Sequence, residues 1–400
     1  MRQSTPLILL VLAATPRLAS ADPRPIVLNG GAGSDIANAI VRAGENTQAV
    51  APNVGGGTWS RQGPVVELRG LFRVDQPIPM PQVVRIRAVG AVLDCRGMAD
   101  GAFVFDGGGW RCEVSGSMTL VDAPNGIRWN TGTIAKNRSL GMSSISGVHF
   151  SGVRGVAIDL QCRSSVVVVE RCVFDQVRKI LHNRMCDDVT IRNCFANMAN
   201  APGVAPITTE HGRLTIRGGV YTPPSLAKTA PALAWIEALG DRSGTRRREQ
   251  MILLNGVRFG GEYGGMAVVV NRSAGRIEYP SAPGVCITLR DLNASNTINV
   301  GDQAAGVSAP LVLLEQMPNH LLIDGCYGTV RPNYLVDFAP GVDGAAISSA
   351  YSANGLNNRC TMQLQRHNTI RPGEEVPGPL KRFVVGPAAA PPPGKPSRPR

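Results

Sequence analysis

Six ionisable side chains of this chain could form one reactive surface. They are Asp159, His182, Arg184, Glu210, His211 and Glu237, each within or directly after a short apolar segment. Histidine can remove a proton at neutral pH, and arginine can neutralise a carboxylate of a substrate. A pair of carboxylates can instead flank a glycosidic bond and hydrolyse it. The residue types therefore fit β-elimination or epimerisation of a uronate, and also glycoside hydrolysis.

These side chains act together only if the segments that carry them lie side by side. The segments span residues 156–161, 180–184, 207–211, 233–237, 267–272 and 311–316. Each reads as a short strand, and side chains at every second position of a strand share a face. We expect the six residues to face outward on neighbouring strands. A register shift of one residue would turn half of them inward.

A repeat in the sequence predicts how the strands stack. One pattern recurs along the chain. It consists of an apolar residue, any residue, a second apolar residue, two polar or small residues, and then a small or apolar residue. The second apolar residue of each unit is Ile145, Val169, Ile191, Ile216, Leu254, Leu289 and Ile323. The first three intervals are 24, 22 and 25 residues, and the later ones fit one coil plus an inserted loop. No unit can bury its apolar face alone, so the units must stack.

The shape of the unit predicts an all-β fold. Short strands meet at tight polar corners with no helix between them, which excludes a helix-backed repeat. Coils stacked ~4.8 Å apart give parallel strands around an apolar interior. We therefore predict a single-stranded right-handed parallel β-helix (a solenoid) of roughly ten coils. Cys172 and Cys194 then occupy equivalent interior corners, as does Cys326 further along. We interpret them as buried thiols rather than as a disulfide.

The N-terminal part adds a helix and further strands. Residues 34–42 have Ser34 or Asp35 as a cap and apolar residues at helical spacing, which predicts a helix that covers the first coil. A glycine-rich turn at 55–57, a strand at 64–72, a corner from Pro79 to Pro81 and a strand at 83–94 follow. This order, together with the repeat, resembles the pectate-lyase-like β-helix superfamily over most of residues 34–340.

The resemblance implies architecture more specifically than activity. The superfamily includes polysaccharide lyases, glycoside hydrolases, uronate epimerases, phage depolymerases and non-catalytic surface proteins, so the fold leaves the function open. Its members usually bind substrate along the parallel sheet that carries the six residues. The sequence lacks the Asn-Thr-Asp and Arg-Ile-Lys motifs of polygalacturonases, and the Trp-Ile-Asp-His and Asp-Pro-His-Asp motifs of pectate lyases and alginate epimerases. Asp187-Asp188 leads straight into a repeat strand, and we interpret this pair as a structural turn.

Basic residues predict an anionic partner. Lys and Arg number 41 against 29 Asp and Glu, which gives a formal net charge of +12. Arg192 and Arg217 hold the same outward position on successive coils, and Arg290 repeats it two coils later. Arg246, Arg247 and Arg248 add a cationic loop. We expect Arg192, Arg217 and these three arginines to bind an anionic polysaccharide. We do not expect nucleic acid as a partner, because the chain is predicted to be exported and aromatic residues do not interleave with the basic runs.

The two ends of the chain indicate export. Residues 1–21 combine Arg2, an apolar run from Leu7 to Ala14 and a small-residue cleavage pattern at Ala19 to Ala21, which is typical of a signal peptide. Residues 386–400 form a Pro-rich basic tail, predicted to be disordered. Between them we assign an N-terminal segment with the capping helix to 22–60 and the β-helix domain to 61–385. We expect a periplasmic or extracellular protein with no membrane span once the signal is removed.

Our leading hypothesis is an exported β-helix protein that acts on an acidic polysaccharide by lyase or epimerase chemistry. One alternative is a non-catalytic β-helix that binds or scaffolds envelope polysaccharide or exopolysaccharide, and another is a glycoside hydrolase. The sequence requires no cofactor. Ca²⁺ held by carboxylates is the one metal that the lyase hypothesis admits.

Overall fold

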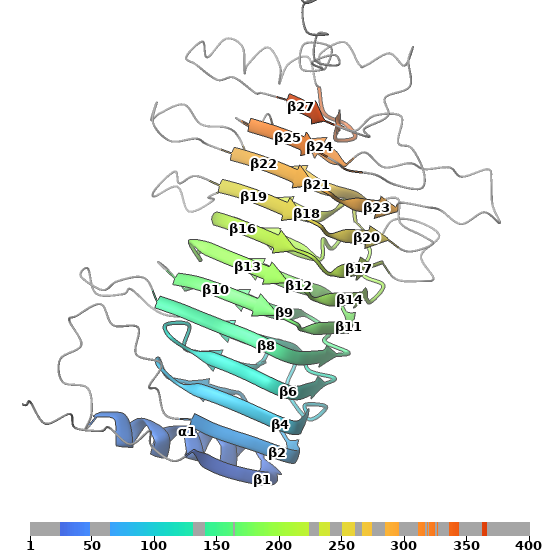
Figure 1. The fold of residues 1–400 in the computed structure, drawn as a ribbon. Coiled ribbons are helices and arrows are strands. Elements are labelled where there is room, and N and C mark those ends of the chain that lie inside the picture. Colours follow the sequence, from blue (N-terminus) through green and yellow to red (C-terminus); the bar gives the residue numbers. More distant parts are fainter. Residues whose placement is uncertain are drawn as a thin grey trace, which may run out of the picture.

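The fold is almost entirely β, and its parallel strands stack along one axis to form long sheets (Figure 1). The structure is a computed structural model, and it describes residues 25–48, 65–130, 141–162, 165–223, 232–240, 250–260, 266–273, 285–295, 311–316, 318, 320–324, 326, 336–343 and 362–365. The predicted signal peptide, the predicted tail and Arg246–Arg248 lie outside these residues. Among the described residues, no helix has the length and apolar character needed to cross a membrane.

The described strands form two sheets, and every pairing within them is parallel. Sheet A contains the main ladder β1 (Ile26–Ala32), β2 (Val65–Arg73), β4 (Arg85–Asp94), β6 (Glu113–Val121), β8 (Gly141–Ser151), β10 (Ser165–Glu170), β13 (Asp188–Arg192), β16 (Gly212–Arg217), β19 (Gln250–Asn255), β22 (Val285–Arg290), β25 (His320–Asp324) and β27 (Met362–Gln365). It also contains the side ladder β11 (Val173–Val177), β14 (Phe195–Met198), β17 (Val220–Thr222), β20 (Arg258–Gly260) and β23 (Asn293–Ser295).

Sheet B runs alongside sheet A and carries the strands predicted to hold the reactive surface. Its strands are β3 (Ile78–Met80), β5 (Phe103–Gly107), β7 (Asn125–Trp129), β9 (Val156–Leu160), β12 (Lys179–Asn183), β15 (Ile207–Thr209), β18 (Ala234–Ala238), β21 (Ala267–Asn271), β24 (Val312–Leu314) and β26 (Val336–Phe338). Successive strands of sheet B are separated in the chain by strands of sheet A. This alternation, together with the parallel pairing, is consistent with a parallel β-solenoid.

The predicted repeat is confirmed by the strand register. All seven apolar residues singled out in the sequence lie in one column, in which each pairs with the next along the main ladder of sheet A. All seven are fully buried. The two polar or small residues that follow them form a corner. There Arg171, Asn193, Gly218, Gly256 and Asp291 have φ values of 50° to 63°. This left-handed conformation favours glycine, asparagine and aspartate, which explains the composition of the corner.

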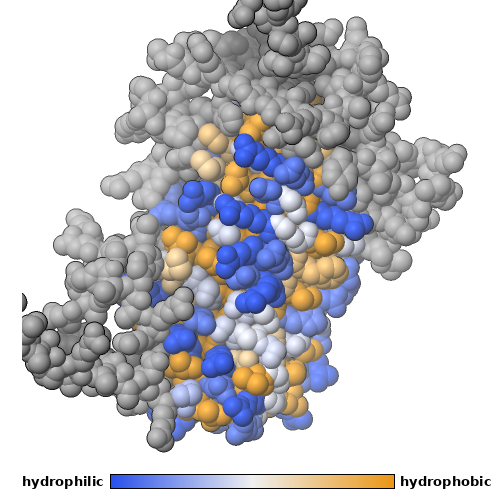
Figure 2. Space-filling model, viewed as in Figure 1, coloured by the Kyte–Doolittle hydropathy of each residue, from blue (hydrophilic) through white to orange (hydrophobic). Residues whose placement is uncertain are grey.

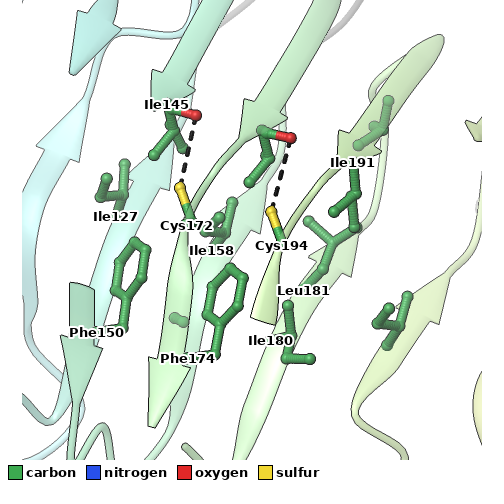
Figure 3. Packing of buried hydrophobic residues seen from close by; sticks show 14 of the residues in the cluster. Ile127, Ile145, Phe150, Ile158, Cys172, Phe174, Ile180, Leu181, Ile191 and Cys194 are labelled. Atoms are coloured by element: carbon green, nitrogen blue, oxygen red, sulfur yellow. Dashed lines mark hydrogen bonds between the residues drawn. The ribbon is translucent and has the colours of Figure 1, made fainter. Parts of the chain in front are cut away.

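The interior between the sheets is packed with apolar side chains (Figure 3). The rings of Phe150 and Phe174 stack on neighbouring strands with centroids 5.1 Å apart. Cys172 and Cys194 follow the same stacking, and their thiols donate to the carbonyl oxygens of Ile145 and Val169 in the preceding strands. Within the described part of the chain no cysteine forms a disulfide. The two thiols therefore act as small core residues.

One helix lies at the N-terminal end of the sheets, where the sequence predicted it. α1 (Gly33–Gln48) contacts β1, β2 and β3 and buries Ile36, Ala39 and Ile40. The carboxylate of Asp35 accepts a hydrogen bond of 2.8 Å from the backbone N–H of Ala32, as in a capping box. Of the two predicted capping residues, Asp35 makes this contact, from the third position of the helix. The helix supplies the apolar cover that the first strands need on their interior side.

Figure 2 shows the face of the molecule that is turned to the viewer in Figure 1. Hydrophilic and hydrophobic residues alternate over the described part of this face. Sheet A contributes the outward positions of Arg192, Arg217 and Arg290, whose register is as predicted: Arg192 pairs with Arg217, and Asn255 lies between Arg217 and Arg290. Arg192 makes an ion pair of 2.7 Å with Glu170 of the preceding coil. Part of the basic stripe is therefore matched by acidic residues.

Candidate functional site

A row of polar side chains crosses the outer face of sheet B. Its members pair in register from one strand to the next, and we call them the outer row: Asp106, Arg128, Asp159, His182, Thr208 and Glu237. The residues on either side of the row in each strand point inward, as the buried Ile158, Leu160 and Leu181 show. The strand register thus brings three of the six predicted residues into one line.

His182 lies between two carboxylates at the centre of the outer row. Its Nε2 is 2.8 Å from Oε1 of Glu210, which directly follows β15, and its Nδ1 is 3.8 Å from Oδ1 of Asp159. An ionised carboxylate can only accept, so Nε2 carries the proton that is donated to Glu210. Nδ1 makes no hydrogen bond to Asp159, since 3.8 Å is too long for one. The side chain is 17% exposed, and that of Glu210 is 23% exposed.

Asp159 is the buried anion of the site. Its side chain is 2% exposed, and it accepts hydrogen bonds from Nε of Arg184 at 3.1 Å and from Nε2 of Gln161 at 3.0 Å. A buried carboxylate is tolerated when it is paired and hydrogen-bonded in this way. Both of its oxygens are occupied, so Asp159 holds its neighbours in place and has little surface to offer a sugar.

Arg184 lies at the edge of the site with donors to spare. It contacts Asp159 through Nε alone, and its side chain is 46% exposed. Among the described residues its two terminal Nη groups have no hydrogen-bond partner. A guanidinium with two adjacent free donors is suited to bind a carboxylate from solvent. Arg184 is therefore the group of this site best placed to hold an acidic substrate.

Lys179 joins the site, although the sequence pattern did not predict it. Its Nζ donates to Oγ1 of the buried Thr208 over 2.6 Å. Burial lowers the pKa of Lys179, and the nearby carboxylate of Glu237 opposes that shift. Strict alternation from His182 would turn Lys179 inward. The alternation is interrupted, because Ile180 and Leu181 are both buried and their backbone N–H groups both point to the carbonyl oxygen of Pro206.

Arg128 is the second residue that sequence reasoning missed. It makes two hydrogen bonds with Asp106, of 2.8 Å and 2.5 Å, and its guanidinium lies 4.6 Å from the centre of the Phe103 ring. Its position one strand before Asp159 places it in the outer row. The signal in the sequence was the alternating segment Asn125–Trp129, whose arginine takes the same outward position as Asp159.

The other end of the outer row holds Glu237. It lies two strands from His182, with Thr208 between them. Arg272 directly follows β21 and contacts Glu237 at 3.5 Å and Glu315 at 3.1 Å. Glu237 thus pairs with Arg272, while its charge also acts on Lys179 beside His182.

His211 does not join the other predicted residues. Its Nε2 is 3.0 Å from Oδ1 of Asp187, in the corner between β12 and β13. Asp188 is the first residue of β13 and pairs with Arg213 on the next strand. The pair Asp187-Asp188 therefore stands at a turn, where it was interpreted to be, and His211 is a partner of that turn.

A buried asparagine ties the corners of two coils together beside His182. Asn183 is fully buried, and its side-chain oxygen accepts from the backbone N–H of Cys186 at 2.9 Å. Its amide donates to the backbone oxygens of His211 at 2.8 Å and Cys186 at 3.2 Å. Asn271 makes equivalent bonds three strands later. These asparagines fix the backbone from which His182 and Arg184 project.

The described residues do not fit a metal centre. They contain no group of three or more histidine, cysteine, aspartate or glutamate side chains arranged to hold an ion. Ca²⁺ takes six to eight oxygen ligands, whereas the carboxylates of Asp159 and Glu210 are engaged by Arg184 and His182. No step below is derived through Ca²⁺.

Comparisons with known proteins give the chain no relative. No family model matches it, and neither the curated proteins nor the solved structures contain a match. The fold assignment therefore rests on the strand pairing, and the proposed function rests on the side-chain geometry around His182.

Proposed function

We propose that this is an exported right-handed β-helix protein of the pectate-lyase-like type that acts on an acidic polysaccharide. The reaction begins with removal of the proton at C5 of a uronate unit, which is the first step of both β-elimination and epimerisation. The observation that carries the proposal is the position of His182. One ring nitrogen is held by Glu210, and the other lies 3.8 Å from the same oxygen of Asp159 that binds the half-exposed Arg184.

The roles follow from the contacts. Arg184 binds the uronate carboxylate through its Nη groups and stabilises the charge that develops there. Nδ1 of His182 takes the C5 proton, and the electron pair moves toward that carboxylate. In elimination the bond between C4 and the glycosidic oxygen then breaks, a C4–C5 double bond forms, and water protonates the leaving oxygen. In epimerisation C5 instead receives a proton on its opposite face. Glu210 orients the imidazole throughout.

Two alternatives use the same surface differently. A non-catalytic polysaccharide scaffold is favoured by the mutual pairing of charges, as in Arg128 with Asp106 and Arg272 with Glu237. A hydrolase would need Asp159 and Glu210 as its two carboxylates. The burial of Asp159 and its bonds to Arg184 and Gln161 argue against that role.

Proton NMR in deuterium oxide separates these possibilities. Purified protein is incubated with polygalacturonate, alginate and other uronate polymers, and the C5 proton signal is followed. Epimerisation replaces this proton with deuterium, and elimination removes it with the appearance of a vinyl signal. Hydrolysis leaves C5 intact but creates new reducing ends. An unchanged spectrum of a polymer that the protein binds would overturn the catalytic proposal in favour of the scaffold.

A further inference from the structure

The amino group of Lys179 and the guanidinium of Arg184 lie on opposite sides of His182. Arg184 binds Asp159, which pairs with His182 on the preceding strand β9. Nζ of Lys179 instead donates to Oγ1 of Thr208, which pairs with His182 on the following strand β15. Neighbouring strands are ~4.8 Å apart, so these contacts span two strand steps. The proposed base therefore lies between two cationic groups, one toward each neighbouring coil.

Thr208 determines where the amino group of Lys179 lies. The threonine is 2% exposed, and its hydroxyl accepts the hydrogen bond of 2.6 Å from Nζ. Lys179 itself is partly exposed. Among the described residues Nζ makes no other hydrogen bond, and an ammonium group has three donors. The remaining donors can therefore bind water or substrate at the surface.

Lys179 is the strongest described candidate for a proton donor on the β15 side of His182. The carboxylate of Glu210 accepts from His182, and that of Glu237 is ion-paired. The hydroxyl of Thr208 is buried and is a far weaker acid than an ammonium group. An acid on this side would complement the base, since His182 removes a proton and the leaving oxygen needs one.

The surroundings of Lys179 suit it to release a proton. Burial lowers the pKa of Lys179, the carboxylate of Glu237 opposes this shift, and the charge of Arg184 adds to it. The carboxylates of Asp159 and Glu210 act in the same direction as Glu237. The lower pKa makes the ammonium group a stronger acid than an ordinary lysine. The three carboxylates favour the protonated form, in which the acid must start.

We infer that Lys179 supplies the proton that water passes to the leaving oxygen during elimination. The inference rests on the proposed function. His182 takes the C5 proton, the electron pair of that bond forms the C4–C5 double bond, and the pair of the C4–O bond stays on the glycosidic oxygen. That oxygen takes a proton from water, and Nζ restores the proton to the water. Lys179 ends the step neutral and His182 ends it protonated, and exchange with solvent resets both.

Lys179→Met tests the inference in the deuterium oxide experiment. The variant retains His182, so deuterium can still replace the C5 proton, whereas the C4–O bond breaks slowly. We expect the vinyl signal to appear ~100-fold or more slowly than with native protein, and the C5 proton to leave within ~5-fold of the native rate. Loss of exchange and elimination by the same factor would overturn the inference, because a structural defect or the loss of a base has that effect.

Arg178→Met is the matched control for the loss of charge. Arg178 is adjacent to Lys179 and carries the same charge, but it is exposed between β11 and β12. Both rates should stay close to those of native protein. A fall in elimination alone, as large as that of Lys179→Met, would overturn the inference, because the effect would then follow from charge near the site.

Lys179→Arg separates proton donation from charge. The variant keeps a positive charge beside Thr208, but arginine is not deprotonated in proteins. We expect elimination to remain ~100-fold or more slower than in native protein. A native rate of elimination in Lys179→Arg would overturn the inference, since a fixed charge would then be sufficient.

A substrate with a better leaving group provides a second test if Lys179→Met does not fold. A uronate that carries 4-nitrophenolate at C4 can release this group without protonation. We expect Lys179→Arg to act on this substrate within ~5-fold of the native rate, whereas His182→Gln stays slow on both the polymer and the aryl substrate. Equal defects of Lys179→Arg on the two substrates would overturn the inference.

The native protein shows whether the inference or the proposed function has failed. If it exchanges the C5 proton of a polymer but never produces a vinyl signal, the proposed function stands as epimerisation and the inference falls. If it neither exchanges nor eliminates on any polymer, the proposed function falls and the inference falls with it.

Discussion

The Nε2 atom of His182 lies 2.8 Å from Oε1 of Glu210, a residue 28 positions later in the chain that directly follows β15, the next strand of sheet B. The orientation of the imidazole therefore depends on the stacking of two neighbouring coils. Asn183 secures the same step, since its amide binds the carbonyl oxygen of His211 beside Glu210. The stacking of these two coils therefore sets the orientation of His182, the proposed base.

Replacement of the proposed base should remove activity without unfolding the protein. We expect His182→Gln to lower the rate of C5 proton removal by ~100-fold or more, which is the usual contribution of a general base. His211→Gln is the matched control, because His211 contacts Asp187 at a corner outside the outer row. It should keep most of the activity. Equal losses in the two variants, measured at equal melting temperatures, would contradict the role of His182.

Loss of the exposed guanidinium should weaken substrate binding. Arg184→Gln removes charged hydrogen bonds to the uronate carboxylate, and we expect kcat/KM to fall by ~10- to 100-fold with most of the change in KM. Arg213→Gln is the control, because this substitution removes a comparable ion pair, between Arg213 and Asp188 on sheet A. A drop of similar size in this control would show that general surface charge, not Arg184, governs binding.

The buried asparagine at the corner should be important for stability. Asn183→Ala removes the hydrogen bond to the backbone N–H of Cys186 and leaves the carbonyl oxygen of His211 with Thr209 as its remaining donor. We expect a loss of ~2–4 kcal/mol in the free energy of unfolding, measured by urea denaturation. Asn197→Ala removes one hydrogen bond to Asp175 at a half-buried position and should cost less than ~1.5 kcal/mol. Indistinguishable unfolding midpoints would show that the corner is held by other contacts.

Stability should fall at alkaline pH because of a buried thiol. Burial raises the pKa of Cys95 to about 12, and the charge of Asp94 adds to the shift. A thiol in the unfolded chain has a pKa of ~8.5, so above that pH the unfolded state loses a proton that the folded state keeps. The free energy of unfolding contributed by Cys95 is therefore complete below pH ~8.5 and declines as the pH rises toward the folded value.

The variant Cys95→Ala isolates this contribution. Its free energy of unfolding should fall less steeply between pH 8 and 10 than that of the native protein. The difference between the two proteins should therefore shrink with rising pH. Parallel pH profiles would mean that the thiol is not protected from ionisation in the folded state.

The repeat was predictable because it rests on alternation alone. Ile145, Val169 and Ile191 lie in one column since each coil must present its apolar residues to the same interior. Alternation failed at Lys179, because Ile180 and Leu181 are both turned inward and Lys179 therefore lies on the outer face. No residue type in that segment signals this interruption.

The sequence also could not predict which side chains contact each other across a corner. Glu210 and His211 are adjacent, yet the first contacts His182 and the second contacts Asp187. The direction of each side chain is set by the end of β15 and the corner that follows, where the regular alternation of a strand stops. The burial of Val270 on the outer face was hidden for a similar reason, since an apolar run reads the same whether a strand is covered on one face or on both.

The most direct test of the central claim is the ultraviolet absorbance of the C4–C5 double bond during incubation with a panel of uronate polysaccharides. The assay compares native protein with His182→Gln and is run with Ca²⁺ and with a chelator. The account predicts rising absorbance with native protein on at least one polymer or, if the reaction is epimerisation, exchange of the C5 proton without absorbance, and ~100-fold or more slower reaction with the variant. A flat trace with native protein on every polymer, with C5 protons retained in the NMR spectrum, would contradict it.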